Sequence, residues 1–230
     1  MNSPLRPNRL KKKILLLVSI ALIATGLTCL FFYFYWYFTG EKIVQIDLPG
    51  NLGIGLENST VIEEVVSEAV IREHNVPANQ PRYITVPDLG INKTRILSVG
   101  LDKDGHIDTP VNIFDAAWFN QSGKPGEVDK VMFIDGHNGG PTKDGIFKNL
   151  PKLKIGATVE IERGDGKVFR YQVTENYIQS LDEFDSAKMQ QILTSSQNQE
   201  MLAIVSCTGK WIQARRAYTD RVVVRAVRLE

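Results

Sequence analysis

The pattern of hydrophobic and polar positions divides the chain into two unlike parts. Residues 14–38, ILLLVSIALIATGLTCLFFYFYWYF, contain no charged side chain, whereas later apolar runs are short and separated by polar positions. A helix needs about 20 apolar residues to cross the hydrocarbon core of a bilayer. We therefore expect a transmembrane helix over 14–38, preceded by a basic tail at 1–13.

The residues that flank this run predict its orientation. Arginines and lysines gather before it, at positions 6, 9 and 11–13, and eight aromatic residues occupy its end at 31–38. Cationic flanks stay in the cytoplasm, and aromatic rings favour the membrane interface. A cleaved signal peptide is the alternative, but its apolar region is about 7–15 residues long and ends in small residues. We therefore expect a single-pass protein of the cell membrane with a cytoplasmic N-terminus and an extracellular C-terminal domain.

Residues 39–81 are expected to form an extracellular linker. Apolar residues recur at helical spacing within TVIEEVVSEAVIREH, and Thr60 followed by Glu63 is typical of a capping box. The pattern predicts a short amphipathic helix over 60–73, ended by the proline-containing segment 75–81.

From Arg82 onward the pattern favours β-structure. Short β-branched runs bounded by proline or glycine predict strands, and Asp165–Gly166 indicates a hairpin turn. The expected strands are 82–87, 94–101, 130–137, the hairpin 157–179, 201–207 and 220–229. Short helical segments are expected at 114–119, at 145–153 where Pro151 closes the segment, and from Asp185. Many short strands with few helices predict a closed or sandwiched β-architecture.

The charge and the cysteine content limit the classes of function that the chain can have. The 27 basic and 26 acidic residues are interspersed, which gives no indication of nucleic-acid binding. The only cysteines are Cys29, inside the apolar run, and Cys207. A single cysteine in an exported domain suggests intermolecular pairing or a reactive thiol.

Three residues at strand ends are candidates for nucleophilic chemistry. His137 and Cys207 each end an apolar strand, and Arg221 begins the last one. A thiolate can attack a carbonyl, a histidine can exchange protons with it, and an arginine can stabilise the oxyanion. Each residue also has an ordinary structural role open to it: core packing for the cysteine, a turn for the histidine and a solvated strand end for the arginine. No second ligand stands at metal spacing from the histidines, so we expect no metal and no cofactor.

These residues and their surroundings resemble the sortase family of cysteine transpeptidases. His137 lies in FIDGHNGG, Arg221 in DRVVVRAV, and AIVSC is a loose match to the family pattern Thr-Leu-x-Thr-Cys, in which Ser206 keeps the hydroxyl. Residues 86–137, with VGLDKDG, Pro-Val-Asn at 110–112 and Pro-Gly-Glu before the histidine strand, resemble class F and class E-like sortases. The likeness extends from Arg82 to Leu229.

The resemblance implies an eight-stranded β-barrel over 82–230 and a cysteine transpeptidase, a thiol peptidase in mechanism. Cys207 would be the nucleophile, His137 the general acid and base, and Arg221 the oxyanion stabiliser. The substrates would be surface proteins that bear a C-terminal sorting signal similar to Leu-Pro-x-Thr-Gly. The acyl group would pass through a thioacyl-enzyme to an amine of a cell-wall precursor or a pilin, and the enzyme would be monomeric. Segment 176–200 is the expected specificity loop.

Other interpretations are kept beside this one. L,D-transpeptidases have a glycine before their cysteine, which VSCTG lacks, and papain-like hydrolases have cysteine before histidine in the chain. Arg215 and Arg216 are rival cations, and Arg221 is preferred because it lies on the strand that the family uses. The non-enzymatic alternative is an anchored β-domain for adhesion or assembly, with Cys207 as core packing.

Overall fold

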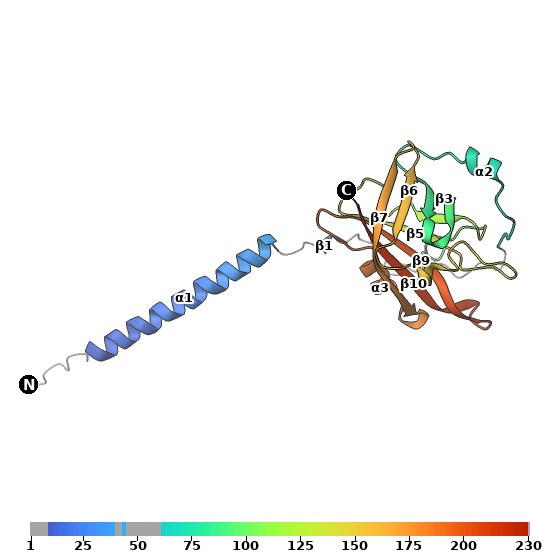
Figure 1. Cartoon of the computed structure of the whole chain (residues 1–230). Coiled ribbons are helices and arrows are strands. Elements are labelled where there is room, and N and C mark those ends of the chain that lie inside the picture. The colour runs from blue at the N-terminus through green and yellow to red at the C-terminus, as the bar shows by residue number, and fades with distance from the viewer. Residues whose placement is uncertain (1–8, 40–42, 45–60, 230) are drawn as a thin grey trace, which may run out of the picture. The chain divides into compact units, whose positions relative to one another are not determined.

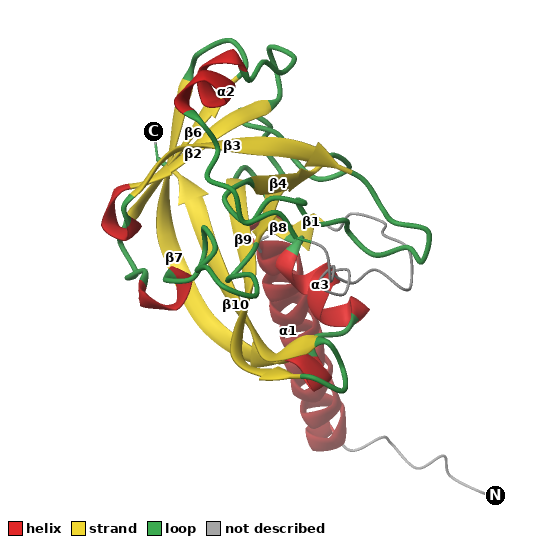
Figure 2. Ribbon diagram, turned by 90° about the vertical axis from the view of Figure 1, so that its right-hand side faces the viewer, coloured by secondary structure: helices red, strands yellow, loops and turns green. Residues whose placement is uncertain are grey.

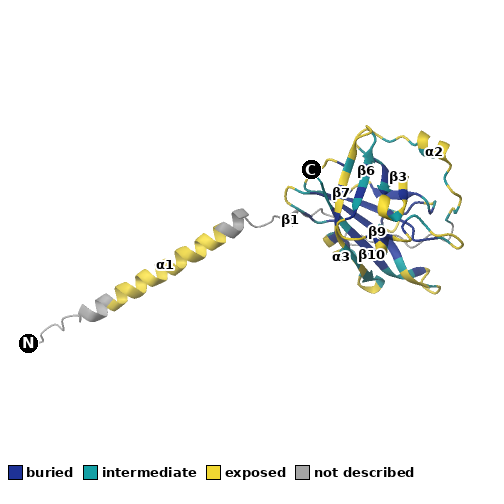
Figure 3. Cartoon of the chain, viewed as in Figure 1, coloured by how far each residue is buried: buried dark blue, intermediate teal, exposed yellow. Residues whose placement is uncertain are grey.

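The computed structural model describes residues 9–39, 43–44 and 61–229, and the chain divides into two compact units, Met1–Lys42 and Ile43–Glu230. The first unit contains helix α1, Arg9–Thr39. Its segment Ile14–Phe34 is long and apolar enough to cross a membrane. The described side chains of this segment are exposed (Figure 3). Outside a membrane such a surface would be costly, since transfer of apolar area from water is favourable.

The second unit is built around a closed barrel of eight strands (Figure 1). The order around the barrel is β10-β7-β6-β2-β3-β4-β5-β9. The strands are β2 Pro81–Val86, β3 Ile91–Val99, β4 Ala116–Phe119, β5 Lys130–Gly136, β6 Thr158–Arg163, β7 Val168–Ser180, β9 Glu200–Ile212 and β10 Ala217–Arg228. Closure leaves the barrel sheet without an unpaired edge. The predicted eight-stranded barrel is confirmed.

Two of the barrel pairings are parallel, β3 with β4 and β5 with β9, and the others are antiparallel. The parallel pairing aligns Ile134 with Ile204 and Asp135 with Val205. It therefore brings the C-terminal ends of β5 and β9 to the same end of the barrel.

Strands β5, β9 and β10 are buried on both faces. Alternate residues such as Ile134, Leu202 and Ile204 belong to the main core cluster. The residues between them, such as Phe133 and Val205, belong to a second cluster with Met189 and Ile192 of helix α3. Side chains alternate between the two faces of a strand, which explains why these strands read as continuous apolar runs.

The helices of the second unit are short (Figure 2). They are α2 Glu68–Glu73, α3 Ser186–Ile192 and the 3₁₀ turns η1 Pro87–Leu89, η2 Leu150–Lys152 and η3 Leu181–Glu183. Helix α3 begins where predicted, because the Asp185 carboxylate accepts a hydrogen bond of 2.8 Å from the amide of Lys188. Between β7 and β9, the two-residue strand β8, Ser195–Ser196, pairs with β1, Ile43–Val44.

The helical turn predicted at 114–119 is wrong. Residues 116–119 form β4, which pairs in parallel with β3 and antiparallel with β5. All four of its residues are buried. A short apolar run does not distinguish a buried strand from a buried helical turn, and here pairing with two neighbouring strands decides the conformation.

The helix predicted over 60–73 is largely wrong. Only Glu68–Glu73 is helical, with Ser67 as its N-cap, and the described residues 61–67 before it are not helical. Ile62 instead forms a parallel bridge with Asn112. Thr60 lies outside the described residues, and the Glu63 carboxylate binds the backbone at 142–143 instead of capping a helix. Tertiary contacts therefore override the apolar periodicity.

The helical segment predicted at 145–153 is reduced to the 3₁₀ turn η2, Leu150–Lys152. Pro151 lies inside this turn instead of ending a helix. Its fixed φ and missing amide hydrogen suit the first turn of a helix, where no intrahelical partner is needed.

Candidate active site

Three neighbouring strands of the barrel bring the candidate residues together. Strands β5, β9 and β10 are consecutive in the sheet. His137 follows the last residue of β5, Cys207 lies in β9, and Arg221 lies in β10. All three are buried.

Cys207 and Arg221 lie directly opposite each other in the antiparallel pairing of β9 with β10. Side chains of such a pair point to the same face, with Cβ atoms about 4.5–5.5 Å apart. Cys207 lies two residues after Val205, and Arg221 two residues before Val223, so both continue the strand face that packs toward α3. The register therefore places the side chain of Arg221 next to that of Cys207 on one face of the sheet.

His137 is brought beside Cys207 by the parallel pairing of β5 with β9. The aligned pairs Ile134–Ile204 and Asp135–Val205 are followed by a hydrogen bond of 2.8 Å from the Ser206 hydroxyl to the Gly136 carbonyl. Ser206 is buried, so this bond is shielded from water. It joins the residue before the cysteine to the residue before the histidine.

The imidazole of His137 is held by the segment at 110. Its Nε2 lies 2.6 Å from the carbonyl oxygen of Pro110. A carbonyl oxygen only accepts hydrogen bonds, so Nε2 carries the hydrogen and donates it. In the neutral ring Nδ1 is then the unprotonated nitrogen, which can accept or return a proton.

The guanidinium of Arg221 is partly engaged. Its Nη1 donates to the carbonyls of Asp220 at 3.1 Å and Tyr218 at 3.4 Å. Its Nε is buried and has no hydrogen-bond partner among the described residues. A buried donor without an acceptor costs about 1–3 kcal/mol. An oxyanion that accepted a hydrogen bond from Nε would give this buried donor a partner, and the free energy so gained would stabilise the oxyanion.

The rival cations are placed differently. Arg215 and Arg216 lie in the turn between β9 and β10 and are exposed. Arg215 forms an ion pair of 2.5 Å with Asp182. Of these three arginines, Arg221 is the one in register with Cys207.

The sequence predicts these three side chains as candidates but does not predict the groups that hold them. The carbonyl of Pro110 is a backbone atom, and a backbone acceptor leaves no side-chain signal. Two features of the sequence point to these supporting groups: the Pro-Val-Asn segment at 110–112 and the hydroxyl of Ser206.

Comparisons with known proteins agree with this fold. The sortase domain family model matches residues 84–229. Among solved structures, sortase C-1 from Streptococcus pneumoniae is 16% identical with a TM-score of 0.52, covering 81% of this chain and 83% of that one. The lid mutant of sortase A from Corynebacterium diphtheriae is 19% identical with a TM-score of 0.51, covering 69% and 74%.

A third similar structure is the complex of Streptococcus agalactiae sortase C1 with MTSET, at 19% identity and a TM-score of 0.50, covering 71% of this chain and 74% of that one. Comparison with curated protein sequences gave no match. At these identities the structural matches show a shared fold, and the family model spans most of the chain. This chain therefore belongs to the sortase family.

Proposed function

We propose that this protein is a membrane-anchored sortase in which Cys207, His137 and Arg221 carry out transpeptidation. The observation that carries the proposal is the register of the barrel, which pairs Cys207 with Arg221 and aligns β5, directly before His137, with β9. The substrates are surface proteins with a sorting signal similar to Leu-Pro-x-Thr-Gly. Segment 176–200, which contains the connection between β7 and β9, is the proposed specificity region.

In the first half-reaction the Cys207 thiolate attacks the carbonyl carbon of the scissile peptide bond. The negative charge that develops on the carbonyl oxygen is stabilised by the guanidinium of Arg221. The C–N bond then breaks, and the leaving amine takes a proton from His137. The products are a thioacyl-enzyme and the released C-terminal fragment.

In the second half-reaction an amine of a cell-wall precursor or a pilin attacks the thioester. His137 takes the proton from this amine, the C–S bond breaks, and the sulfur leaves as the thiolate. The new peptide bond joins the surface protein to the acceptor, and the site returns to its initial protonation state.

Helix α1 is the proposed anchor, with the basic residues before Ile14 in the cytoplasm. A membrane-impermeant thiol reagent should label a cysteine added after Glu230 in intact cells that carry the Cys29→Ser and Cys207→Ala changes. Labelling only after lysis would mean that the catalytic unit lies inside the cell.

The function is tested by assaying cleavage of sorting-signal peptides with the full-length protein in detergent. Cys207→Ala should abolish cleavage and transfer to an added amine, because no other described residue is placed to form the thioester. The circular dichroism spectrum should be unchanged, since the substitution removes one small group at a strand end. An alanine variant that cleaves as fast as the wild type would contradict the proposal and favour a structural Cys207.

A further inference from the structure

The segment before the barrel is attached to the loop that precedes β4. The amide of Ile62 donates to the carbonyl of Val111 at 2.9 Å, and the amide of Ile113 donates to the carbonyl of Ile62 at 3.1 Å. The side chain of Asn112 donates to the carbonyl of Glu64 at 2.9 Å. Residues 62–64 thus lie along 111–113 and are joined to them by one parallel bridge, Ile62 with Asn112.

The carboxylate of Glu63 attaches the same segment to a second loop. Its Oε1 accepts from the amides of Thr142 at 2.8 Å and Lys143 at 2.9 Å, and its Oε2 accepts from the Thr142 hydroxyl at 2.5 Å. The ammonium of Lys143 donates to the carbonyl of Glu63 at 2.9 Å. These hydrogen bonds lower the pKa of Glu63 below its usual range, with that from the Thr142 side chain the largest cause.

Gly140 leaves the space that this carboxylate fills. A Cβ added at position 140 would contact Oε1 of Glu63 and approach its Cδ to 3.0 Å. An alanine there would therefore push the carboxylate away. The φ of Gly140 is not in the positive range, so alanine itself would not strain the backbone.

Both attached loops hold His137. The 110–113 loop supplies the Pro110 carbonyl to its Nε2. On the other loop, Gly145 donates to the Asn138 carbonyl at 2.8 Å and Phe147 to the His137 carbonyl at 3.0 Å. The two loops also meet directly, because the amide of Ile146 donates to the Ile113 carbonyl at 2.9 Å.

We propose that Glu63 is a positioning residue for His137: its carboxylate clamps the 140–143 turn to the segment 62–64 and so fixes the two loops that hold the imidazole. The catalytic meaning of this clamp rests on the proposed role of His137. The hydrogen bonds of the clamp are exposed to water, where the net stabilisation from each is modest, so loss of the clamp should change geometry more than folding. A misplacement of about 1 Å in a catalytic group can cost about 10²-fold in rate.

The test uses the full-length protein in detergent and a fluorogenic sorting-signal peptide. Glu63→Ala should lower kcat by about 10–100-fold with KM little changed, because proton transfer and not peptide binding is affected. The rate at which a small alkylating reagent modifies Cys207 should stay within about twofold, since the nucleophile is untouched.

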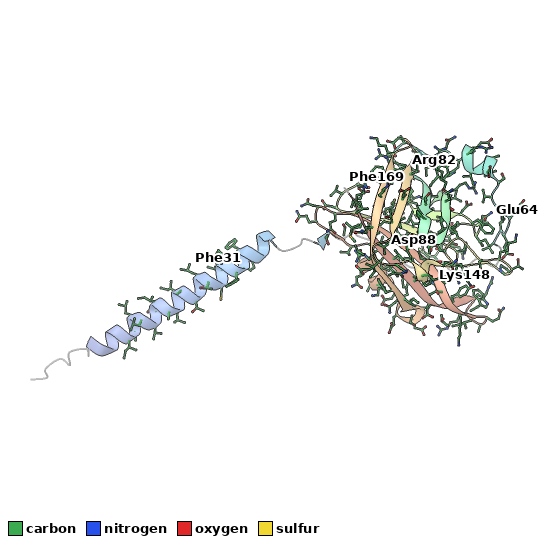
Figure 4. The ribbon with its side chains drawn as sticks, in the orientation of Figure 1. Phe31, Glu64, Arg82, Asp88, Lys148 and Phe169 are labelled. Atoms are coloured by element: carbon green, nitrogen blue, oxygen red, sulfur yellow. The ribbon has the colours of Figure 1, made fainter. Side chains whose placement is uncertain are left out.

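Three variants separate the clamp from a general effect of substitution. Glu63→Gln should retain most of kcat, because its amide oxygen can accept from both backbone amides while its NH₂ donates to the Thr142 hydroxyl. Gly140→Ala should lower kcat as Glu63→Ala does without altering Glu63. Glu64→Ala should leave kcat unchanged, because the Glu64 side chain is exposed at the surface of the barrel unit (Figure 4) and takes part through its backbone carbonyl.

Hydrogen exchange of the 139–145 segment supplies a readout that does not depend on activity. Glu63→Ala and Gly140→Ala should speed exchange there, and Glu63→Gln should not. Unchanged exchange or unchanged kcat in Glu63→Ala would overturn the clamp, as would a Gln variant as impaired as the Ala variant. A wild type that cleaves no sorting peptide would instead contradict the proposed function.

Discussion

At the scale of single residues, the chemistry available at the site depends on which polar groups already have a hydrogen-bond partner. The Pro110 carbonyl fixes the hydrogen on Nε2 of His137, so Nδ1 is the unprotonated nitrogen of the neutral ring. Arg221 keeps a buried Nε without a partner among the described residues. Arg215, by contrast, is exposed and already paired with Asp182. A preorganised donor that still lacks an acceptor is suited to stabilise a charge that appears only during the reaction.

The three arginines should therefore differ strongly in their effect on catalysis. Arg221→Ala should lower kcat for peptide cleavage by about 10²–10³-fold, the usual loss when one oxyanion donor is removed. Arg215→Ala and Arg216→Ala should stay within a few-fold of the wild type. Single-turnover cleavage assays of the three variants measure this, and the reverse ranking would assign the role to the 215–216 pair.

Residue-level features were predictable from the sequence where a side chain ends an apolar run. His137, Cys207 and Arg221 became candidates in this way, and the resemblance to sortases supplied the roles proposed for them. The clamp at Glu63 was not predicted, because its partners are the distant amides of Thr142 and Lys143. The local pattern at Glu63 pointed to a helix cap instead.

At the scale of elements, the strands with long apolar runs were predicted well and the short pieces were not. Strands β5, β9 and β10 carry strong local signals because both their faces are buried. Strand β4 has only four residues and owes its conformation to β3 and β5. The same holds for Ile62, which is extended because it pairs with the loop at 111–113. The local pattern of apolar residues gives no information about pairing between segments that are distant in the sequence.

A contact between strands β7 and β9 lies far from the candidate active site, so a mutation there should change stability without changing catalysis. The Tyr171 hydroxyl on β7 donates to the buried carboxylate of Glu200 at the start of β9, which also accepts from the amide of Gly126 at 2.8 Å. Cys207 lies seven residues farther along β9, about 23 Å away at about 3.3 Å per residue. Tyr171→Phe should lower the free energy of unfolding by about 1–3 kcal/mol, because it removes a donor to a buried carboxylate. Chemical denaturation measures this change, and kcat for cleavage should be unaltered.

The same tyrosine predicts a dependence of stability on pH. Burial, followed by the charge of Glu200, raises the pKa of Tyr171 far above its usual value of 10.0. Its stabilising contribution is complete below pH 10 and is lost as the pH rises, because the unfolded chain then releases the phenol proton first. Unfolding between pH 9 and 11 should therefore show a steeper fall for the wild type than for Tyr171→Phe. Equal slopes would mean that Tyr171 titrates normally.

At the scale of the whole molecule, the chain combines an apolar helix with a sortase barrel. Both parts were predictable, since one depends on an uninterrupted apolar run and the other on several motifs in a fixed order. The assignment to class F or the class E-like group stays a prediction, as do the sorting motif and the acceptor amine. These depend on loop surfaces that short-range patterns do not define.

The intact mass of the full-length protein after incubation with a sorting-signal peptide and rapid acid quenching tests the central claim most directly. We predict an increase equal to the acyl part of the peptide, attached at Cys207, which disappears when an amine acceptor is added and is absent in Cys207→Ala. Peptide cleavage without this adduct, or the same adduct in Cys207→Ala, would contradict a thioacyl mechanism at this site.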